Sequence, residues 1–337
     1  MQRFQRRQFL LASAALIAAP RARAEKAGKT YRVAFILRAS PPKVMAGREP
    51  AHPIFRAFVH ELRSLGYDEG RNLILERRTL EGKLDRYLEI FTDLARRDTQ
   101  VIVTIGAGPE LKRACDAVSP IPIVLFAASE PVKHGLAKSL AHPGGNVTGL
   151  LYYPGGDFEA KRFELLKEMV PMLKRASYLV PKLALERKDE IAEGAIQAAR
   201  ATGVELRMAQ YTGHEFAPAF AAIERDKPDA LFVSPYPDVY AYRKTVVAFA
   251  RKARLPDCYS HPEFAREGGL MSYAPDSLDF GRRAALYVDK ILKGARAGEL
   301  PFERPEKFVF VVNLRTAKSL GIDVPRSVLL RADKVIE

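Results

Sequence analysis

Residues 101–126 read VIVTIGAGPELKRACDAVSPIPIVLF, two apolar runs separated by a segment with helical character. The runs at 101–105 and 121–126 predict strands, and a helix is expected around 110–117. A strand–helix–strand unit of this kind places its strands side by side in parallel, with a right-handed crossover. This stretch therefore predicts an α/β fold built on a parallel sheet.

The same alternation extends in both directions along the chain. Upstream, strands at 31–37 and 73–78 alternate with helices at 52–65 and 84–96. The expected downstream elements are helices at 158–170, 188–201, 217–225 and 238–253 and strands at 177–181, 204–209, 230–234 and 257–260. A chain of 337 residues favours two domains over one, so we expect two doubly wound sheets.

A stretch between these two series, AHPGGNVTGLLYYPGGDFEAK (141–161), encloses a short apolar run between two Pro-Gly-Gly turns. Glycine reaches backbone angles closed to other residues, so such turns release a segment from the sheets on either side. We interpret 147–153 as an extended strap between two lobes; the alternative is a hairpin arm on one lobe.

The tail adds a strand within 268–275, a helix at 278–292, a strand at 307–312 and a short helix at 314–320. These are too few for a third domain, so the chain is expected to cross between the lobes more than once.

The first 24 residues have the pattern of an export signal. Arg3, Arg6 and Arg7 precede a short apolar run, and small residues surround a cleavage point near Ala24. The pair Arg6-Arg7 also resembles a twin-arginine signal. The alternative is an uncleaved interfacial helix, which Pro20 would break. We expect export to an oxidising bacterial compartment, the periplasm.

Charge and cysteine content exclude several classes of function. Removal of the leader, with its five arginines and no acidic residue, lowers the formal net charge from +14 to +9. The remaining excess is scattered beside apolar helix positions, which indicates solvated faces and no nucleic-acid stripe. Cys115 and Cys258 are far apart and show no metal spacing, so two separate buried thiols are expected. No apolar run reaches the roughly 18 to 20 residues of a membrane-spanning helix.

Candidate ligand-binding residues lie where the predicted strands end, because open α/β sheets hold ligands at the carboxyl ends of their strands. In the first lobe this rule selects the loop Arg38-Ala39-Ser40 together with Ala107, Gly108, Ser129 and Glu130. In the second lobe it selects the loop Ser234-Pro235-Tyr236, Asp238, His261 and Glu263, and the crossings add Tyr152, Tyr153 and Tyr273.

These residue types suit a small zwitterion with an apolar body. Helix N-termini and the hydroxyls of Ser40 and Ser129 are expected to hold a carboxylate. Asp238 or Glu130 would meet an ammonium group, and Tyr152 or Tyr273 would stack on the apolar part. The alternatives are helix N-capping for Ser234 and Asp238 and lobe packing for Tyr152.

Several segments resemble the ABC-transporter substrate-binding proteins of the branch associated with tryptophan and tyrosine uptake. They are NVTGL (146–150) after HPGG, LGYDEGRNLILERR (65–78), GGLMSYAPD (268–276), YVDKILKGARAGELP (287–301) and FVVNLRTAKSLGIDVP (310–325). The resemblance implies a type I periplasmic-binding fold with two Rossmann-like lobes and a multi-stranded hinge. It divides the chain into 31–150 with 274–300 and 151–273 with 301–337. The loops at 106–109 and 129–131 depart from the family pattern, so the resemblance does not imply which ligand binds.

The resulting prediction is a monomeric, exported solute-binding protein of an ABC importer. Its partners would be a small ligand, an amino acid or a related aromatic or hydrophobic carboxylate, and an inner-membrane permease. It would need no cofactor and no metal, and hinged closure of the lobes would trap the ligand. The alternatives are a sensor subunit that presents ligand to a membrane receptor and an exported α/β enzyme. The sequence has no GxSxG motif, no P-loop and only dispersed histidines, so an enzyme is not expected.

Overall fold

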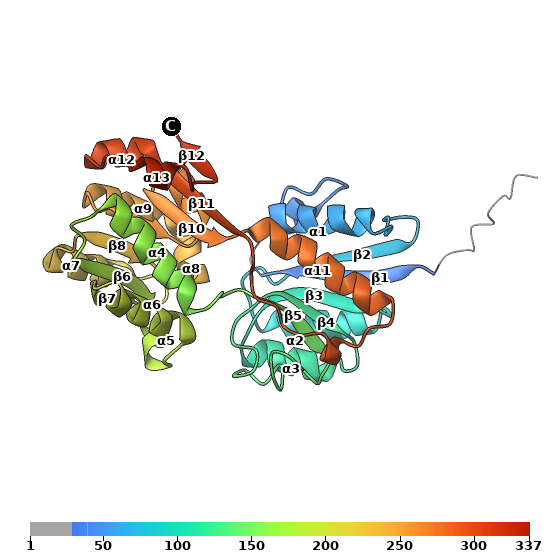
Figure 1. The fold of residues 1–337 in the computed structure, drawn as a ribbon. Helices are drawn as coiled ribbons and strands as arrows, with labels where there is room; N and C mark the ends of the chain where they lie inside the picture. The colour runs from blue at the N-terminus through green and yellow to red at the C-terminus, as the bar shows by residue number, and fades with distance from the viewer. Residues whose placement is uncertain (1–28, 39) are drawn as a thin grey trace, which may run out of the picture.

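The computed structural model describes residues 29–38 and 40–337. The predicted export signal and Ala39 lie outside the described residues. Two lobes lie side by side and are joined by a few thin segments (Figure 1). Each lobe is built on its own sheet, and both sheets are mainly parallel. The predicted α/β class with two sheets is therefore confirmed.

The first lobe has a five-stranded parallel sheet in the order β2-β1-β3-β4-β5. Its strands are β1 (Tyr31–Leu37), β2 (Leu73–Thr79), β3 (Val101–Gly106), β4 (Ile123–Ala128) and β5 (Val147–Leu151). One face is covered by α1 (Pro53–Ser64) and α11 (Ser277–Leu292), and the other by α2 (Arg86–Ala95) and α3 (Pro109–Ala117). Short 3-10 turns lie at η1 (Pro42–Met45) and η2 (Ala297–Glu299).

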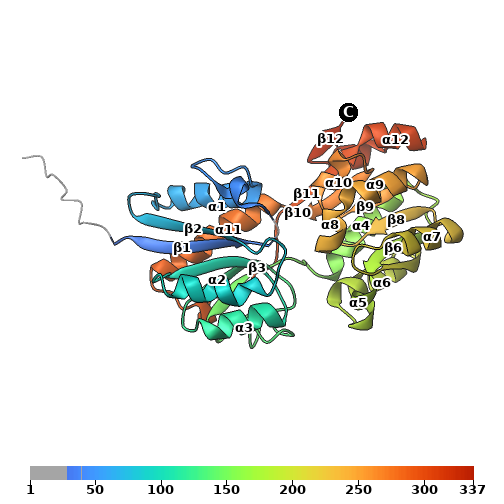
Figure 2. The ribbon, with the colours of Figure 1, turned by 180° about the vertical axis from the view of Figure 1, so that it is seen from behind.

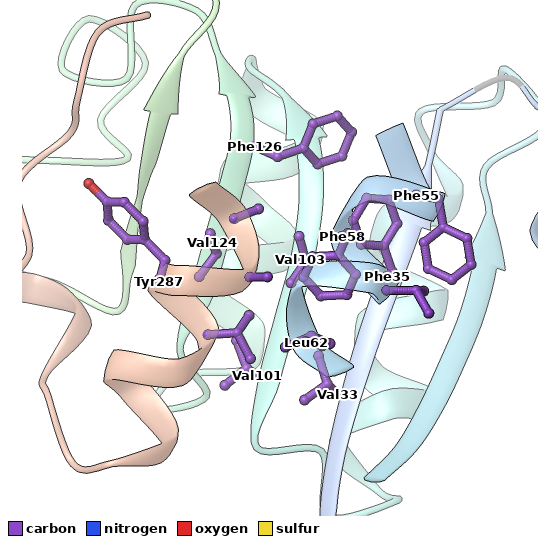
Figure 3. Close-up of a cluster of buried hydrophobic side chains, with 14 of the residues drawn as sticks. Val33, Phe35, Phe55, Phe58, Leu62, Val101, Val103, Val124, Phe126 and Tyr287 are labelled. Carbon is purple, nitrogen blue, oxygen red and sulfur yellow. The ribbon is translucent and has the colours of Figure 1, made fainter. Parts of the chain in front are cut away.

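Burial on both faces explains the uninterrupted apolar sequence of β1. Val33 and Phe35 point to the α1 and α11 side, whereas Ala34 and Ile36 point to the α2 and α3 side. The ring of Phe35 lies 4.8 Å from that of Phe58 and 5.1 Å from that of Phe126, centroid to centroid (Figure 3). Successive side chains of the strand point to opposite faces of the sheet, so one continuous apolar run contributes to two separate cores.

The second lobe has a seven-stranded sheet in the order β12-β11-β10-β9-β8-β6-β7. Its strands are β6 (Arg175–Pro181), β7 (Glu205–Tyr211), β8 (Ala230–Val233), β9 (Asp257–Tyr259), β10 (Met271–Pro275), β11 (Phe308–Asn313) and β12 (Lys334–Ile336). One face is covered by α4 (Gly156–Met169), α5 (Lys182–Glu186), α6 (Glu190–Ala201), α12 (Leu314–Leu320) and α13 (Arg326–Leu329). The other is covered by α7 (Ala217–Asp226), α8 (Pro237–Ala241), α9 (Arg243–Lys252) and α10 (Pro262–Arg266). Only the pairing of β10 with β11 is antiparallel within the described part of this sheet.

The tail of the chain contributes to both lobes. After β10, helix α11 packs on α1 of the first lobe, where Gly281 allows close approach: a Cβ there would lie 2.2 Å from the carbonyl oxygen of Ile54. The chain then returns, and β11 pairs with β10 of the second lobe. The lobes are consequently linked by three crossings, at residues 152–155, at Asp276 and at 304–307.

Two expectations about individual elements are wrong. Residues 147–151 are not a free strap, because they form β5 and pair in parallel with β4, so the first crossing shrinks to 152–155. The helix expected at 238–253 is broken at Tyr242 into α8 and α9. The two cysteines lie in different lobes as free buried thiols, which confirms that expectation.

Candidate functional site

The carboxyl ends of the strands in both lobes meet at the three crossings. In the first lobe β5 leads directly into the crossing at 152–155, and its parallel neighbours end at the same edge. In the second lobe β10 leads into the crossing at Asp276, and β9, β8 and β6 run parallel to it. Figure 2 shows β3 on one side and β10 and β11 on the other reaching the connecting segments. We call the region between these two edges the junction.

Tyr152, the first residue after β5, connects the lobes directly. Its backbone N–H donates to the carbonyl of Ala128 at 2.8 Å, which holds it to the end of β4. Its hydroxyl lies 2.8 Å from Nε2 of His261 in the second lobe. The ring also lies 6.3 Å from that of Phe280 in α11. Tyr152 thus contacts residues of both lobes while remaining partly accessible.

His261 follows β9 and is held as a neutral imidazole. Burial lowers its pKa to about 3, and the nearby Arg162 guanidinium adds to this effect. Because the ring is neutral, Nε2 can accept the hydrogen bond from Tyr152, and the hydroxyl of Ser260 lies 3.3 Å from Nδ1. The ring centroid of Tyr240 lies 4.8 Å away. The strand-end rule selected this position, but side-chain direction across the junction could not be derived from sequence.

Tyr153 points the opposite way and anchors the crossing in the second lobe. Its side chain is 2% exposed, and its ring packs against that of Phe158 at 6.2 Å. Its hydroxyl presses on α6 so closely that a Cβ at Gly194 would lie 2.3 Å from it. Its carbonyl accepts a hydrogen bond from Arg304, 3.2 Å away, in the third crossing. The two adjacent tyrosines therefore fix the same segment to different surroundings.

The loop after β3 brings the backbone into the junction at Gly106, Ala107 and Gly108. Gly106 and Gly108 have φ angles of 128° and 100°, which side-chain-bearing residues rarely adopt. A Cβ at Gly106 would also lie 3.0 Å from the hydroxyl of Tyr87. Helix α3 follows without a side-chain cap. Ala107 and Gly108 are therefore placed at the junction, where the sequence predicted them.

The other first-lobe candidates are held by local contacts. The carbonyl of Ser40 accepts a hydrogen bond of 2.7 Å from the hydroxyl of Thr79. Ser129 precedes Glu130, whose φ of 42° lies in the left-handed region. The Glu130 carboxylate forms an ion pair of 2.7 Å with Lys133. Glu130 is thus already partnered, which weakens its expected role as a receptor for an ammonium group.

The second-lobe candidates Ser234 and Asp238 do not cap a helix. Tyr236 is the N-cap residue of α8, and no side-chain capping bond is formed there. The Ser234 side chain is buried, and its hydroxyl has no hydrogen-bond partner among the described residues. Asp238 is partly buried and forms no ion pair within residues 29–38 and 40–337. Both residues remain binding candidates by position.

Tyr273 lies in β10 and has a packing role. Its ring stacks on that of Phe308 at 5.2 Å and on that of Phe158 at 5.8 Å. These three rings form a small cluster between the start of α4 and the β10–β11 pair. The side chain is only half-buried, so part of it stays accessible at the edge of the cluster.

A buried ion pair, which the sequence did not reveal, lies beneath the second lobe's part of the junction. Glu159 and Arg162 in α4 are both 0% exposed and are joined by a 2.7 Å contact. Nη2 of Arg162 also donates to the carbonyls of Val233 and Cys258, at 2.7 and 2.9 Å. Arg162 therefore ties together the ends of β8 and β9, from which the loops with Ser234 and His261 begin. The available signal was two opposite charges three residues apart on an apolar helix.

Residues 51–336 match the family model described as ABC transporter substrate binding protein. The chain belongs to this family. The family that its sequence motifs resemble is therefore confirmed. A curated relative, a tyrosine-binding protein of Clostridioides difficile (strain R20291), is 24% identical over 267 residues. That alignment covers 79% of this substrate-binding protein and 76% of the relative.

Two solved structures are similar to this substrate-binding protein over 91% of its chain and 100% of theirs. One is a conserved domain protein of Vibrio cholerae, with 26% identity and a TM-score of 0.77. The other is an ABC domain from Streptococcus pneumonia in complex with L-Trp, with 22% identity and a TM-score of 0.77. The shared architecture is the type I periplasmic-binding fold that the motifs implied.

Two hollows on the surface of this substrate-binding protein lie outside the junction candidates. One, of about 640 Å³, is next to Tyr31 and Asn146, at the amino ends of the first lobe's strands. The other, of about 520 Å³, is lined by Phe216, Phe220 and Tyr242. Neither contains a residue predicted to bind ligand. None of the helices in the described ranges combines the length and apolar character needed to cross a membrane.

Proposed function

We propose that this chain is an exported solute-binding protein of an ABC importer that captures a small ligand at the junction. The observation that carries the proposal is the meeting of two sets of strand carboxyl ends at three short crossings, which is where open α/β sheets hold ligands. Family membership gives the class, and the ligand-facing residues would be Ser40, Ala107, Gly108, Ser129, Glu130, Tyr152, Ser234, Asp238 and Tyr273.

The ligand class we propose is an amino acid or a related aromatic or hydrophobic carboxylate. The junction offers tyrosines, hydroxyls and backbone groups, and a relative with 24% identity is named for binding tyrosine. Closure of the lobes about residues 152–155, Asp276 and 304–307 would bury the ligand, since only a closed form contacts it from both sides. An inner-membrane permease would then receive the ligand, after export to the periplasm and cleavage near Ala24.

The test is thermal unfolding with a panel of hydrophobic and aromatic amino acids and related carboxylates. We expect at least one member to raise the unfolding temperature and to reduce the radius of gyration in solution scattering. Mass spectrometry of small molecules released from natively purified, then denatured, protein would identify the ligand independently. Absence of any stabilising compound across the panel would contradict the proposal, and binding without compaction would contradict lobe closure alone.

A further inference from the structure

Arg38 is a cation at the junction for which the described residues provide no counterion. It follows β1 directly and is partly buried. Its backbone is fixed, since its carbonyl accepts a hydrogen bond of 2.8 Å from the N–H of Gly82. Its guanidinium forms no ion pair and no side-chain hydrogen bond with residues 29–38 or 40–337. By contrast, Glu130 is paired with Lys133 and Glu263 with Arg266.

Arg38 lies where the connections that leave two neighbouring strands of the first lobe pass to opposite faces of the sheet. The chain leaves β1 toward α1 on one face of the sheet and leaves β3 toward α3 on the other. Such a switch point leaves a crevice beyond the ends of the two central strands. The hydroxyl of Tyr87 donates to the carbonyl of Ile105 there. A Cβ at Gly106 would lie 3.0 Å from that hydroxyl.

The charge of Arg38 acts on the hydroxyl of Tyr87, the tyrosine that contacts the end of β3. Burial raises the pKa of Tyr87 to about 12, and the positive charge of Arg38 acts in the opposite direction. Arg38 directly follows β1, and β1 pairs in parallel with β3, so Arg38 lies where the ends of these two neighbouring strands meet. A ligand in this crevice would meet the loop at 106–108 and a guanidinium that has no acidic partner among the described residues.

Closure of the lobes would remove water from Arg38, and without a partner for its charge this would raise the free energy of the closed form. A charge removed from water without a partner loses hydration that nothing replaces. A carboxylate is a matched partner, because guanidinium can donate two parallel hydrogen bonds to its oxygens.

We propose that Arg38 binds the carboxylate of the ligand and that this pairing makes lobe closure depend on an anionic group. The inference rests on the proposed function, because it assigns the ligand class and its anchor at that same site. It goes beyond the sequence expectation, in which only helix N-termini and serine hydroxyls received the carboxylate.

The experiment compares matched ligand pairs with the full mature protein and three variants. The probes are L-tyrosine with L-tyrosinamide, L-leucine with L-leucinamide, and benzoate with benzamide, each measured by calorimetric titration. The variants are Arg38→Gln, Arg38→Lys and Arg86→Gln. Arg86 is the matched control, since it lies at the same edge of the first lobe but is paired with Glu81.

We expect carboxylates to bind and their amides to bind at least tenfold more weakly. Arg38→Gln should lose about tenfold or more in affinity, Arg38→Lys should retain part of it, and Arg86→Gln should equal the wild type. Equal affinity of an acid and its amide, or unchanged affinity in Arg38→Gln, would overturn the carboxylate anchor while leaving a binding protein. Ligand-free closure in solution scattering would also overturn it, because closure would then not depend on an anionic ligand. Failure of every probe to bind the wild type would instead contradict the proposed function, and the anchor with it.

Discussion

The hydroxyl of Tyr152 lies 2.8 Å from Nε2 of His261, so a hydrogen bond joins the segment leaving the first lobe to a loop of the second. Few other polar contacts between described residues connect the lobes away from the backbone crossings. With a neutral imidazole the hydroxyl can donate to Nε2, and burial, together with the nearby Arg162 charge, lowers the pKa of His261 and so favours the neutral ring. This side-chain contact therefore links the two lobes in addition to the backbone crossings.

Replacement of Tyr152 by Phe should lower the free energy of unfolding by about 1 kcal/mol. The ring contacts with Phe280 and His261 remain, but Nε2 of His261 loses its donor in a largely buried place. Urea unfolding of Tyr152→Phe measures the loss. Tyr31→Phe is the control, because its hydroxyl has no hydrogen-bond partner among the described residues. Equal stability of both variants would show that the Tyr152–His261 bond contributes nothing.

His261 should make the protein less stable at acid pH. Its folded-state pKa of about 3 lies below the ordinary value of 6.5, so the unfolded chain binds the proton more readily. The stability from neutral His261 is complete above about pH 6.5 and is lost as the pH falls toward 3. His261→Asn should remove this component, and the difference between wild type and variant should shrink or change sign on acidification. Parallel pH profiles would contradict the assignment, as would titration of the His261 ring near pH 6.5 in NMR.

Much of the fold could be predicted because a strand that is buried on both faces has an uninterrupted apolar sequence. Apolar runs such as 31–37 and 101–105 are covered on both faces, and both became strands. The sequence could not distinguish the strand at 147–151 from a free strap, because an edge strand and an extended crossing have the same composition. Whether Val147 pairs with Ile123 depends on tertiary contacts that the local pattern does not record.

The junction could be predicted only at the level of loops. The rule on strand ends selects Ala107, Gly108 and Ser234, and the structure has these residues in the loops after β3 and β8, since the rule depends on topology alone. It could not predict that Glu130 pairs with Lys133 or that Tyr273 stacks on Phe308, because these depend on side-chain direction. Their direct roles in binding remain predictions for the ligand panel to test.

Gly281→Ala should destabilise the first lobe by about 1–3 kcal/mol or more, despite the higher helix propensity of alanine. A Cβ at this position would lie 2.2 Å from the carbonyl oxygen of Ile54, so α11 must move away from α1. Thermal unfolding measures the change. Gly145→Ala is the control, since a Cβ there meets nothing within 4 Å and no positive φ is involved. A stabilised Gly281→Ala variant would show that α11 does not pack this closely.

Arg162→Met should cost about 3–5 kcal/mol, because it leaves the buried Glu159 carboxylate and the carbonyls of Val233 and Cys258 without their donor. Burial raises the pKa of Glu159 and attraction by Arg162 opposes this, so removal of Arg162 should also favour protonation of Glu159. The double variant Glu159→Leu/Arg162→Met should recover much of the loss, since it leaves no unpaired buried charge.

The control for this pair is a surface ion pair that α4 forms with the C-terminal segment. Glu168 in α4 pairs with Arg331 at the surface, so Arg331→Gln should change the stability by less than about 1 kcal/mol. If Arg162 also positions the loops after β8 and β9, the double variant should bind ligand more weakly than the wild type even where its stability is restored. Restored stability together with wild-type affinity would restrict Arg162 to a role in folding, because the ends of the two strands would then hold their loops without it.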